Sequence, residues 1–381
     1  MKNKVLEFNK LVNTIFNEDS VPLHRPVFGS NEEKYVQQTI KSSFVSSVGS
    51  FVEQFENNIS THTKSNYSIA TVNGTSALLV CLQLAGVKQE DEVLTQALSF
   101  VATSNSISYL KAKPIFIDVD IDTMGMSPLA LTLFLEEFCE IRDEGTFNKN
   151  TGKRIAACLP MHTFGFMCRI DQISKICKSW NIPLIEDAAE ALGSSFKGKF
   201  AGTFGMFSAF SFNGNKIITS GGGGMILTQN KNLAIQAKHI TTTAKKSTNW
   251  EYFHDQVGYN FRMPNLNAAL GCAQLESLSS FIKNKKKLYD IYCESLPLIG
   301  YAVVPIPKNL NWNYWMISIE LENKREKDLF LKETNKNGIM TRPIWDLLFK
   351  LPMYEDCQRD GQKNALALED KIINIPSSAR G

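Results

Sequence analysis

The chain has 381 residues, of which 43% are hydrophobic and 21% are charged, as is typical of a globular protein that buries a sizeable core. This composition excludes a disordered chain, a collagen-like protein and a disulfide-stapled scaffold. The formal net charge is only +3, which gives no indication of a nucleic-acid-binding surface. We expect the lysine-rich run at 283–287 to be a solvated helix face.

No stretch of the sequence approaches the ~18 apolar residues that a membrane-spanning helix needs. The first residues, MKNKVLEFNK, are charged and lack the apolar block of a signal peptide. The 8 cysteines are scattered without a Cys-x-x-Cys pair, which indicates reduced core thiols rather than a metal or redox site. We therefore expect a cytoplasmic protein that binds no metal and does not associate with a membrane.

Short runs rich in β-branched and aromatic residues alternate with helix-length segments from residue 67 onward. Seven such runs predict strands, at 67–72, 91–96, 114–119, 154–160, 182–187, 207–212 and 224–228. Helices are expected between them, at 76–84, 102–110, 128–140 and 170–179. This alternation predicts an α/β fold with a mainly parallel sheet covered by helices on both faces. The polar segment at 143–153 is expected to be an exposed turn or hairpin.

The composition changes after residue 230. Residues 231–300 are predicted to be helical, and residues 312–320 alternate like a strand. A helix at 325–337 would end at Asn337 and Gly338 with a left-handed cap. We therefore predict three parts, which are an arm or helix at 1–30, a large α/β domain at 31–240 and a small α+β domain at 241–381.

The first candidate site is the segment VNGTSALLV at 72–80. A predicted strand ends there, Gly74 turns the chain, and Thr75 and Ser76 open a helix. Free backbone N–H groups and the helix dipole make such a start a natural site for an anion, most often a phosphate. The same pattern is also typical of a plain threonine N-cap on a buried helix.

The second candidate site is LIEDAAEALG at 184–193, where Asp187 ends a strongly apolar strand. Open α/β sheets bind their ligands at this edge. A half-buried carboxylate there needs a partner, such as a metal, the start of a helix or a protonated heterocycle.

The third candidate site is SAFSFNGNKIITSGGGG at 208–224, in which Lys216 lies between an aromatic strand and four glycines. An apolar environment disfavours the ammonium form of lysine and frees the amine to attack a carbonyl carbon. The glycines allow a mobile turn or a close backbone approach, but they lack the Gly-Lys-Ser/Thr of a nucleoside-triphosphate loop. An ordinary surface lysine is the alternative.

Together, the three segments supply the groups that pyridoxal 5′-phosphate requires. The helix start would cradle the phosphate, the acid would pair with the pyridine nitrogen, and the lysine would form a Schiff base. The presence of all three segments in one chain favours this cofactor over the alternatives that each segment allows by itself, such as a helix cap or a surface lysine.

Longer motifs carry a resemblance to a known family. They are PLHRPVFGSNEEKYV, SSFVSSVGSFVEQFE, EDAAEALGS, SFNGNKIITSGGGGMI, GYNFRMPNLNAALG and GIMTRPIW. From about residue 22 onward the chain resembles the sugar-nucleotide aminotransferases of the DegT/DnrJ/EryC1/StrS family. These have the aspartate-aminotransferase-like fold type I, a large domain with a seven-stranded sheet plus a smaller domain. Within the family it is most similar to the 4-aminotransferases of the legionaminic acid and bacillosamine pathways.

The resemblance implies a role for each matching residue. Lys216 and Asp187 would be catalytic, through the Schiff base and the ring nitrogen. The other cofactor contacts would be Phe100 on the ring, Glu190 beside the ring oxygen, Gly74, Thr75 and Ser211 at the phosphate, Asn213 beside the lysine, and Asn260 at the phosphate from the neighbouring subunit. Asn215 also flanks the lysine, and Asn213 and Asn215 would contact either phosphate or sugar. Arg262 and Arg342 would bind substrate phosphate or donor carboxylate, unless they form surface or structural ion pairs. His162 is expected to be structural.

The resemblance also implies a homodimer with a shared active site. Glutamate would give its amino group, through pyridoxamine 5′-phosphate, to C4 of a nucleotide-linked 4-keto-6-deoxy (N-acetyl) hexose. C3 amination or a perosamine-type product on the same fold is the alternative. A sugar dehydratase is disfavoured because those relatives carry histidine in place of Lys216, and a non-catalytic regulator is disfavoured by the intact residue set. Relatives usually continue past the IPSS segment with a final helix, whereas this chain stops at Gly381, and the resemblance leaves open whether the C-terminus is truncated.

Overall fold

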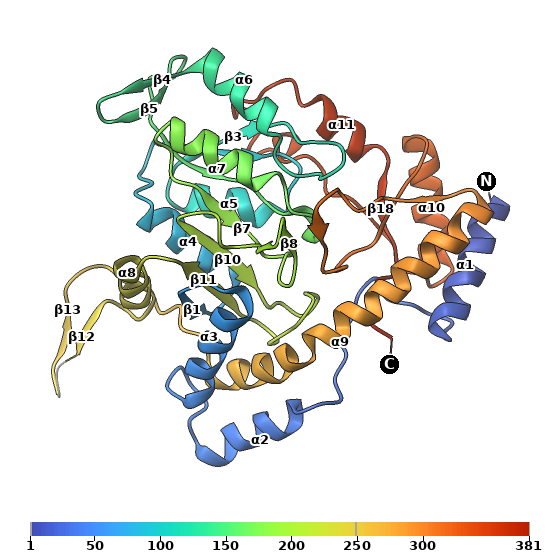
Figure 1. Cartoon of the computed structure of the whole chain (residues 1–381), viewed down its shortest axis with the longest axis horizontal. Coiled ribbons are helices and arrows are strands. Elements are labelled where there is room, and N and C mark those ends of the chain that lie inside the picture. The colour runs from blue at the N-terminus through green and yellow to red at the C-terminus, as the bar shows by residue number, and fades with distance from the viewer. Residues whose placement is uncertain (1, 248–249, 381) are drawn as a thin grey trace.

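A computed structural model describes residues 2–247 and 250–380. Its central feature is a sheet of seven strands, around which the helices are arranged (Figure 1). Two sets of strands form it, in the order β1 (Tyr67–Thr71), β11 (Gly224–Thr228), β10 (Phe207–Ser211), β7 (Ile185–Asp187), then β6 (Ile155–Leu159), β2 (Glu92–Gln96) and β3 (Lys113–Ile117). Parallel bridges from Cys158 to Leu184 and from Met161 to Asp187 join the two sets. All strands but β11 run the same way, which confirms the predicted α/β fold with a mainly parallel sheet.

Successive strand residues point to opposite faces of the sheet, and each face has its own core. Ile69 and Val93 belong to one core, whereas their neighbours Ala70 and Leu94 belong to the other. The first face is covered by α4 (Gly74–Leu84), α5 (Val101–Tyr109) and α8 (Lys231–Thr241). The second is covered by α3 (Ser50–Thr63), α6 (Pro128–Phe138), α7 (Ile170–Ser179) and the start of α9 (Asn265–Ser295). Because helices cover both faces, ligands reach the sheet at the strand ends.

A second, antiparallel sheet lies towards the C-terminus. Its strands are β14 (Ala302–Val303), β16 (Ser318–Glu320), β18 (Ile372–Asn374) and β17 (Arg342–Pro343). The helix α1 (Lys2–Phe16) packs against α10 (Lys324–Lys336), with the rings of Phe8 and Phe330 4.9 Å apart. The 31-residue helix α9 runs between this region and α2 (Glu32–Ser42) (Figure 1). The domain boundaries at 30 and 240 stay predictions.

Shorter elements complete the described chain. They are β8 (Ser195–Phe196), β9 (Lys199–Phe200), β15 (Leu310–Asn311), α11 (Lys363–Glu369) and the 3₁₀ turns η1 (Thr163–Gly165), η2 (Leu296–Ile299) and η3 (Leu348–Lys350). The polar insertion lies in the hairpin of β4 (Cys139–Arg142) and β5 (Gly145–Asn148), as expected, but Thr146 and Asn148 are buried rather than exposed.

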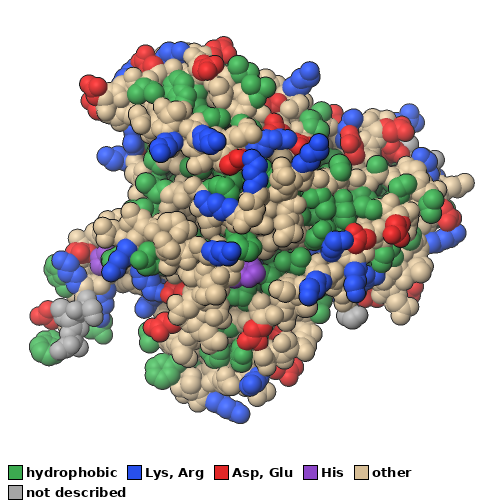
Figure 2. All heavy atoms as spheres, viewed as in Figure 1, with side chains coloured by type: hydrophobic (Ala, Val, Ile, Leu, Met, Phe, Trp, Pro, Cys, Tyr) green, Lys and Arg blue, Asp and Glu red, His purple; other side chains and the backbone are tan. Residues whose placement is uncertain are grey.

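Two secondary-structure predictions are wrong in part. Residues 231–300 are not helical throughout, because Thr243 and Ala244 have positive φ angles and lead into a hairpin of β12 (Lys245–Ser247) and β13 (Tyr252–His254). This hairpin projects from the body of the molecule (Figures 1 and 2). The strand expected at 312–320 is reduced to β16, because Tyr314 has φ +56° and residues 312–319 are all buried.

The lysine run at 283–287 is also only partly as expected. Lys285 is buried, and its Nζ donates to the carbonyl of Ser377. On the face shown in Figure 2, Lys and Arg side chains are scattered among acidic and uncharged ones. Six cysteines are buried as expected, while Cys293 is exposed and Cys357 is half-buried. Among the described helices, none is both long and apolar enough for a bilayer span.

Candidate active site

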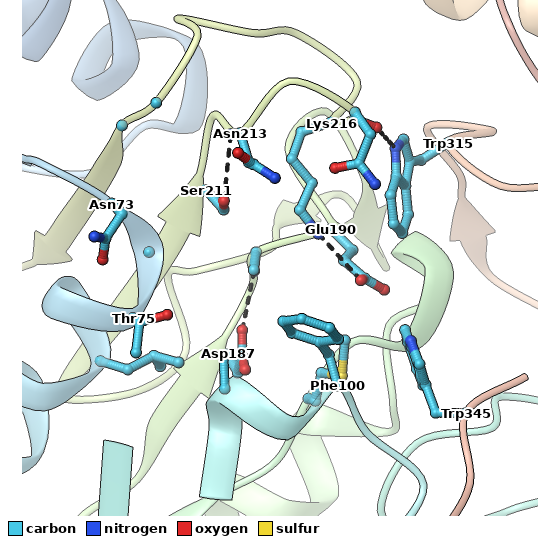
Figure 3. A pocket seen from close by; sticks show the side chains of 18 residues that line it. Asn73, Thr75, Phe100, Asp187, Glu190, Ser211, Asn213, Lys216, Trp315 and Trp345 are labelled. Carbon is cyan, nitrogen blue, oxygen red and sulfur yellow. Dashed lines mark hydrogen bonds and ion pairs between the residues drawn. The ribbon is translucent and has the colours of Figure 1, made fainter. Parts of the chain in front are cut away.

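A cavity of about 390 Å³ opens where β7 and β10 end, beside the start of α4 (Figure 3). The second sheet's region contributes Trp315 and Trp345 to its wall. All the residues predicted to bind a cofactor line this cavity except Asn260; they are Gly74, Thr75, Phe100, Asp187, Glu190, Ser211, Asn213 and Lys216. The fold therefore brings the three candidate segments to one place.

The start of α4 is capped by Asn73, whose Oδ1 accepts a hydrogen bond from the Ser76 amide at 2.7 Å. The alternative of a threonine cap is therefore wrong. In the described part of the chain, the amides of Gly74 and Thr75 have no acceptor, so they can bind an anion at the positive end of the helix dipole. A Cβ at position 74 would lie 2.9 Å from the Cβ of Ser211, so glycine is what lets the end of β10 approach.

Asp187 is a buried carboxylate at the end of β7. Its Oδ2 accepts from the Thr103 hydroxyl at 2.7 Å and its Oδ1 accepts from the Ala189 amide at 3.2 Å. Burial raises the pKa of Asp187, and these two hydrogen bonds partly offset that shift. The ring of Phe100 faces the cavity between Asp187 and Trp345 (Figure 3) and is 51% exposed. The acid thus lies in an apolar wall and retains capacity for a further partner.

Lys216 enters the cavity from a turn in which its amide donates to the carbonyl of Asn213 at 3.0 Å. Its Nζ lies 3.1 Å from Oε1 of Glu190 and 4.4 Å from the ring centroid of Trp315. The other oxygen of Glu190 accepts from the Phe164 amide at 2.9 Å. Burial raises the pKa of Glu190, which the positive charge of Lys216 counteracts. The cavity therefore holds one amine and two buried carboxylates.

The residue before Asp187 has different surroundings. Glu186 accepts from the amides of Gly202, Phe204 and Gly205, and Nε2 of His162 lies 3.1 Å from its Oε2. Both side chains are fully buried, and neither lines the cavity. His162 is therefore placed as a structural residue would be.

Three predicted residues lie outside the cavity. Asn260 is exposed and pairs with Thr242 in a β-bridge. Arg262 lines a separate cavity of about 180 Å³, where its buried Nε has no partner among the described residues. Arg342 is exposed and lines a neighbouring cavity of about 470 Å³.

Sequence reasoning missed the two tryptophans and the cap residue Asn73. Trp315 lies in the segment that alternation assigned to a strand, and its Nε1 donates to the carbonyl of Asn215 at 2.7 Å. The density of aromatic residues in WNYW at 312–315 is a signal that could have suggested a binding wall. No such local signal identifies Trp345, because only the folded chain brings it to Phe100.

Comparisons with known proteins agree with this geometry. The model of the DegT/DnrJ/EryC1/StrS aminotransferase family matches residues 26–380. The chain is 35% identical over 360 residues to GDP-perosamine synthase of Escherichia coli O157:H7, covering 94% of this chain and 93% of the relative.

Solved structures share the fold. The aminotransferase TlmJ from Streptoalloteichus hindustanus superposes with a TM-score of 0.85 at 22% identity, covering 94% of this chain and 93% of that one. Helicobacter pylori PseC, an aminotransferase involved in the biosynthesis of pseudoaminic acid, gives a TM-score of 0.83 at 22% identity, with the same coverage of 94% and 93%.

Proposed function

The chain belongs to the DegT/DnrJ/EryC1/StrS aminotransferase family, and we propose that it moves an amino group from glutamate to C4 of a nucleotide-linked 4-keto-6-deoxy hexose. Enzymes of this family are sugar aminotransferases that use pyridoxal 5′-phosphate. The observation that carries the proposal is the single cavity in which Lys216, Asp187 and the start of α4 come together.

The residues present fit this cofactor. The free amides of Gly74 and Thr75, with the hydroxyls of Thr75 and Ser211, offer donors for a phosphate at a helix start. The exposed ring of Phe100 offers a flat apolar wall. Asp187 is a buried acid whose charge a protonated ring nitrogen would balance.

When bound, pyridoxal 5′-phosphate supplies an electron-accepting ring that stabilises negative charge on the donor's α carbon. Asp187 would hold the proton on the ring nitrogen, and Glu190 would lie beside the ring oxygen. Lys216 Nζ would attach the cofactor and later move a proton at the reacting carbon, a transfer typically worth about 10²- to 10⁴-fold in rate. Trp315 and Trp345 would narrow the access of water to that amine.

Two types of product are compatible with this activity. The motif resemblance favours an N-acetylated amino sugar of the legionaminic acid or bacillosamine type. The 35% identity to GDP-perosamine synthase favours a GDP-linked, perosamine-type product at least as strongly. The nucleotide and the presence or absence of an N-acetyl group on the sugar therefore distinguish the two candidates.

We also propose a homodimer in which each site is completed by the partner. Asn260 is exposed and outside its own cavity, as a residue serving the other subunit would be. Phe44 and Val48 are 59% and 60% exposed, as apolar side chains that a second subunit covers would be. The loop at 47–49 next to them lines the cavity of Arg262. Light scattering tests the dimer, and loss of cofactor affinity in Asn260→Ala tests the shared site. The cytoplasmic location stays a prediction.

The direct test supplies the purified enzyme with glutamate and, separately, UDP- and GDP-linked 4-keto-6-deoxy sugars. We expect 2-oxoglutarate and an amino sugar whose new C4–N bond is visible by NMR. An amine at C3 would correct the position. Formation of no amino sugar, with turnover of keto acids instead, would contradict the proposed function.

A further inference from the structure

Lys216 and Glu190 form an ion pair inside the active-site cavity, with Nζ 3.1 Å from Oε1 (Figure 3). The side chain of Glu190 is 2% exposed and that of Lys216 is 13% exposed, so little water reaches either group. In the described part of the chain, no other carboxylate forms an ion pair with Lys216. A proton that leaves the amine therefore has one acceptor close to it.

Hydrogen bonds hold Glu190 in this position. Its Oε2 accepts from the Phe164 amide at 2.9 Å, and its carbonyl accepts from Asn313 Nδ2 at 2.8 Å. Phe164 has a left-handed backbone with φ +56°, and a non-glycine residue keeps this conformation only where its surroundings fix it. Among the described residues, Lys216 is the only partner of Oε1. One oxygen of Glu190 is thus fixed by the fold, and the other is directed to the amine.

The amine of Lys216 needs a base. An amine attacks a carbonyl carbon only with a free electron pair on its nitrogen, and a lysine with the ordinary pKa of about 10.4 is neutral in only ~1 of 10³ molecules at pH 7. Burial raises the pKa of Glu190, which the positive charge of Lys216 counteracts, so this carboxylate accepts a proton more readily than an exposed glutamate does. It also lies within the reach of about 2.6–3.2 Å that a general base requires.

We propose that Glu190 is the general base that takes a proton from the Lys216 ammonium when the cofactor is attached. The Nζ–H bond breaks, its electron pair stays on the nitrogen, and the proton forms an O–H bond at Oε1. The pair is neutral overall before and after the transfer, so the buried cavity gains no net charge. The proposal rests on the proposed function, and it gives a proton-transfer role to a residue that the resemblance places only beside the ring oxygen.

Two other groups near Lys216 are poorer candidates for the base. Asp187 lines the same cavity, but its oxygens accept from a hydroxyl and a backbone amide, and in the described chain it forms no ion pair with Lys216. Its negative charge instead adds to the raised pKa of Glu190. Burial, together with the positive charges of Lys285 and Lys216, lowers the pKa of His24, so a proton on His24 is disfavoured.

The first test follows the attachment of pyridoxal 5′-phosphate to the cofactor-free enzyme by stopped-flow absorbance at saturating cofactor. The wild-type rate should stay level from about pH 7 to 9, where an ordinary glutamate is ionised and an ordinary lysine is protonated, because the proton moves within the pair. Glu190→Gln should be about 10²-fold slower at pH 7, with a rate that rises with pH because only solvent can then take the proton. Glu190→Asp should restore part of the rate and the level profile. The exposed Glu294→Gln, on α9, is the matched control.

Infrared difference spectra of the protein with and without cofactor show where the proton is held. The wild type should gain a protonated-carboxyl band that shifts when its glutamates carry ¹³C, and Glu190→Gln should lack this band. Aspartate stays unlabelled, so a change at Asp187 does not contribute to the shifting band.

Two results would overturn the role of Glu190. One is a Glu190→Gln variant with a level pH profile and a rate within about twofold of the wild type, and the other is a wild type without the shifting band. A wild type to which the cofactor does not attach would instead refute the proposed function, so the two failures are distinguishable.

Discussion

Glu186 and Asp187 are adjacent in sequence and both buried, yet the end of β7 gives them opposite surroundings. Glu186 receives three backbone amides and faces a histidine. Asp187 receives one hydroxyl and one amide and lines the cavity. A buried charge with four hydrogen-bond partners is a closed structural unit, whereas one with two is costly until something else binds. The difference separates a residue that holds the fold from one that holds a ligand.

The largest expected effect on turnover comes from removing the amine of Lys216, which lines the same cavity as Asp187. Lys216→Ala should lower turnover on the order of 10⁴-fold, because no other described lysine lines the cavity. Steady-state kinetics check this, with the exposed Lys231→Ala as control. Wild-type transamination by the alanine variant would remove Lys216 from the mechanism.

The second-largest effect on turnover is expected at Asp187, and it distinguishes this residue from Glu186. Asp187→Asn should lower turnover on the order of 10²-fold and weaken cofactor binding, since an amide does not stabilise a protonated ring nitrogen. Cofactor affinity is measured by fluorescence titration. An unchanged affinity together with unchanged turnover would show that Asp187 does not face the cofactor.

Glu186→Gln should act on stability instead. The amide group would face donors that a carboxylate now accepts from, and the unfolding free energy should fall by about 3 kcal/mol. Denaturant unfolding measures the loss, and active-site titration gives turnover per folded molecule, which should stay within about twofold. If Glu186→Gln unfolds with the wild-type free energy but turns over more slowly, the roles assigned to Glu186 and Asp187 would be reversed.

The smallest effect concerns pH. Burial raises the pKa of Asp187 in the folded state, so the cofactor-free protein binds that proton more tightly than the unfolded chain does. The contribution of Asp187 to the free energy of unfolding is therefore fully present at low pH. It is lost as the pH rises above the pKa of aspartate in the unfolded chain, about 4, and through the raised pKa of the folded state. Cofactor-free Asp187→Asn should melt above the wild type at neutral pH, with a difference that shrinks towards pH 4. A difference that does not vary with pH would contradict this account.

The sequence predicted the part of the site that depends on local patterns. The strand at 207–212, the helix start at Gly74 and the acid at 187 follow from periodicity and from the rule that ligands bind at strand ends. The contact between Trp345 and Phe164 was not predicted, since the two rings meet only through tertiary packing. The strand expected at 312–320 is wrong in part because the left-handed Tyr314 interrupts it and residues 312–319 are all buried. The alternating pattern of the residues at 312–320 therefore does not correspond to alternating buried and exposed side chains.

The central claim is that Lys216 holds the cofactor. Incubating the purified protein with pyridoxal 5′-phosphate, reducing it with borohydride and sequencing its peptides by mass spectrometry tests this directly. We predict a pyridoxyl-phosphate mass increase on the peptide that carries Lys216, with none when Lys216→Ala is treated in parallel. A protein that stays unlabelled, or one labelled equally on other lysines in both forms, would contradict the account.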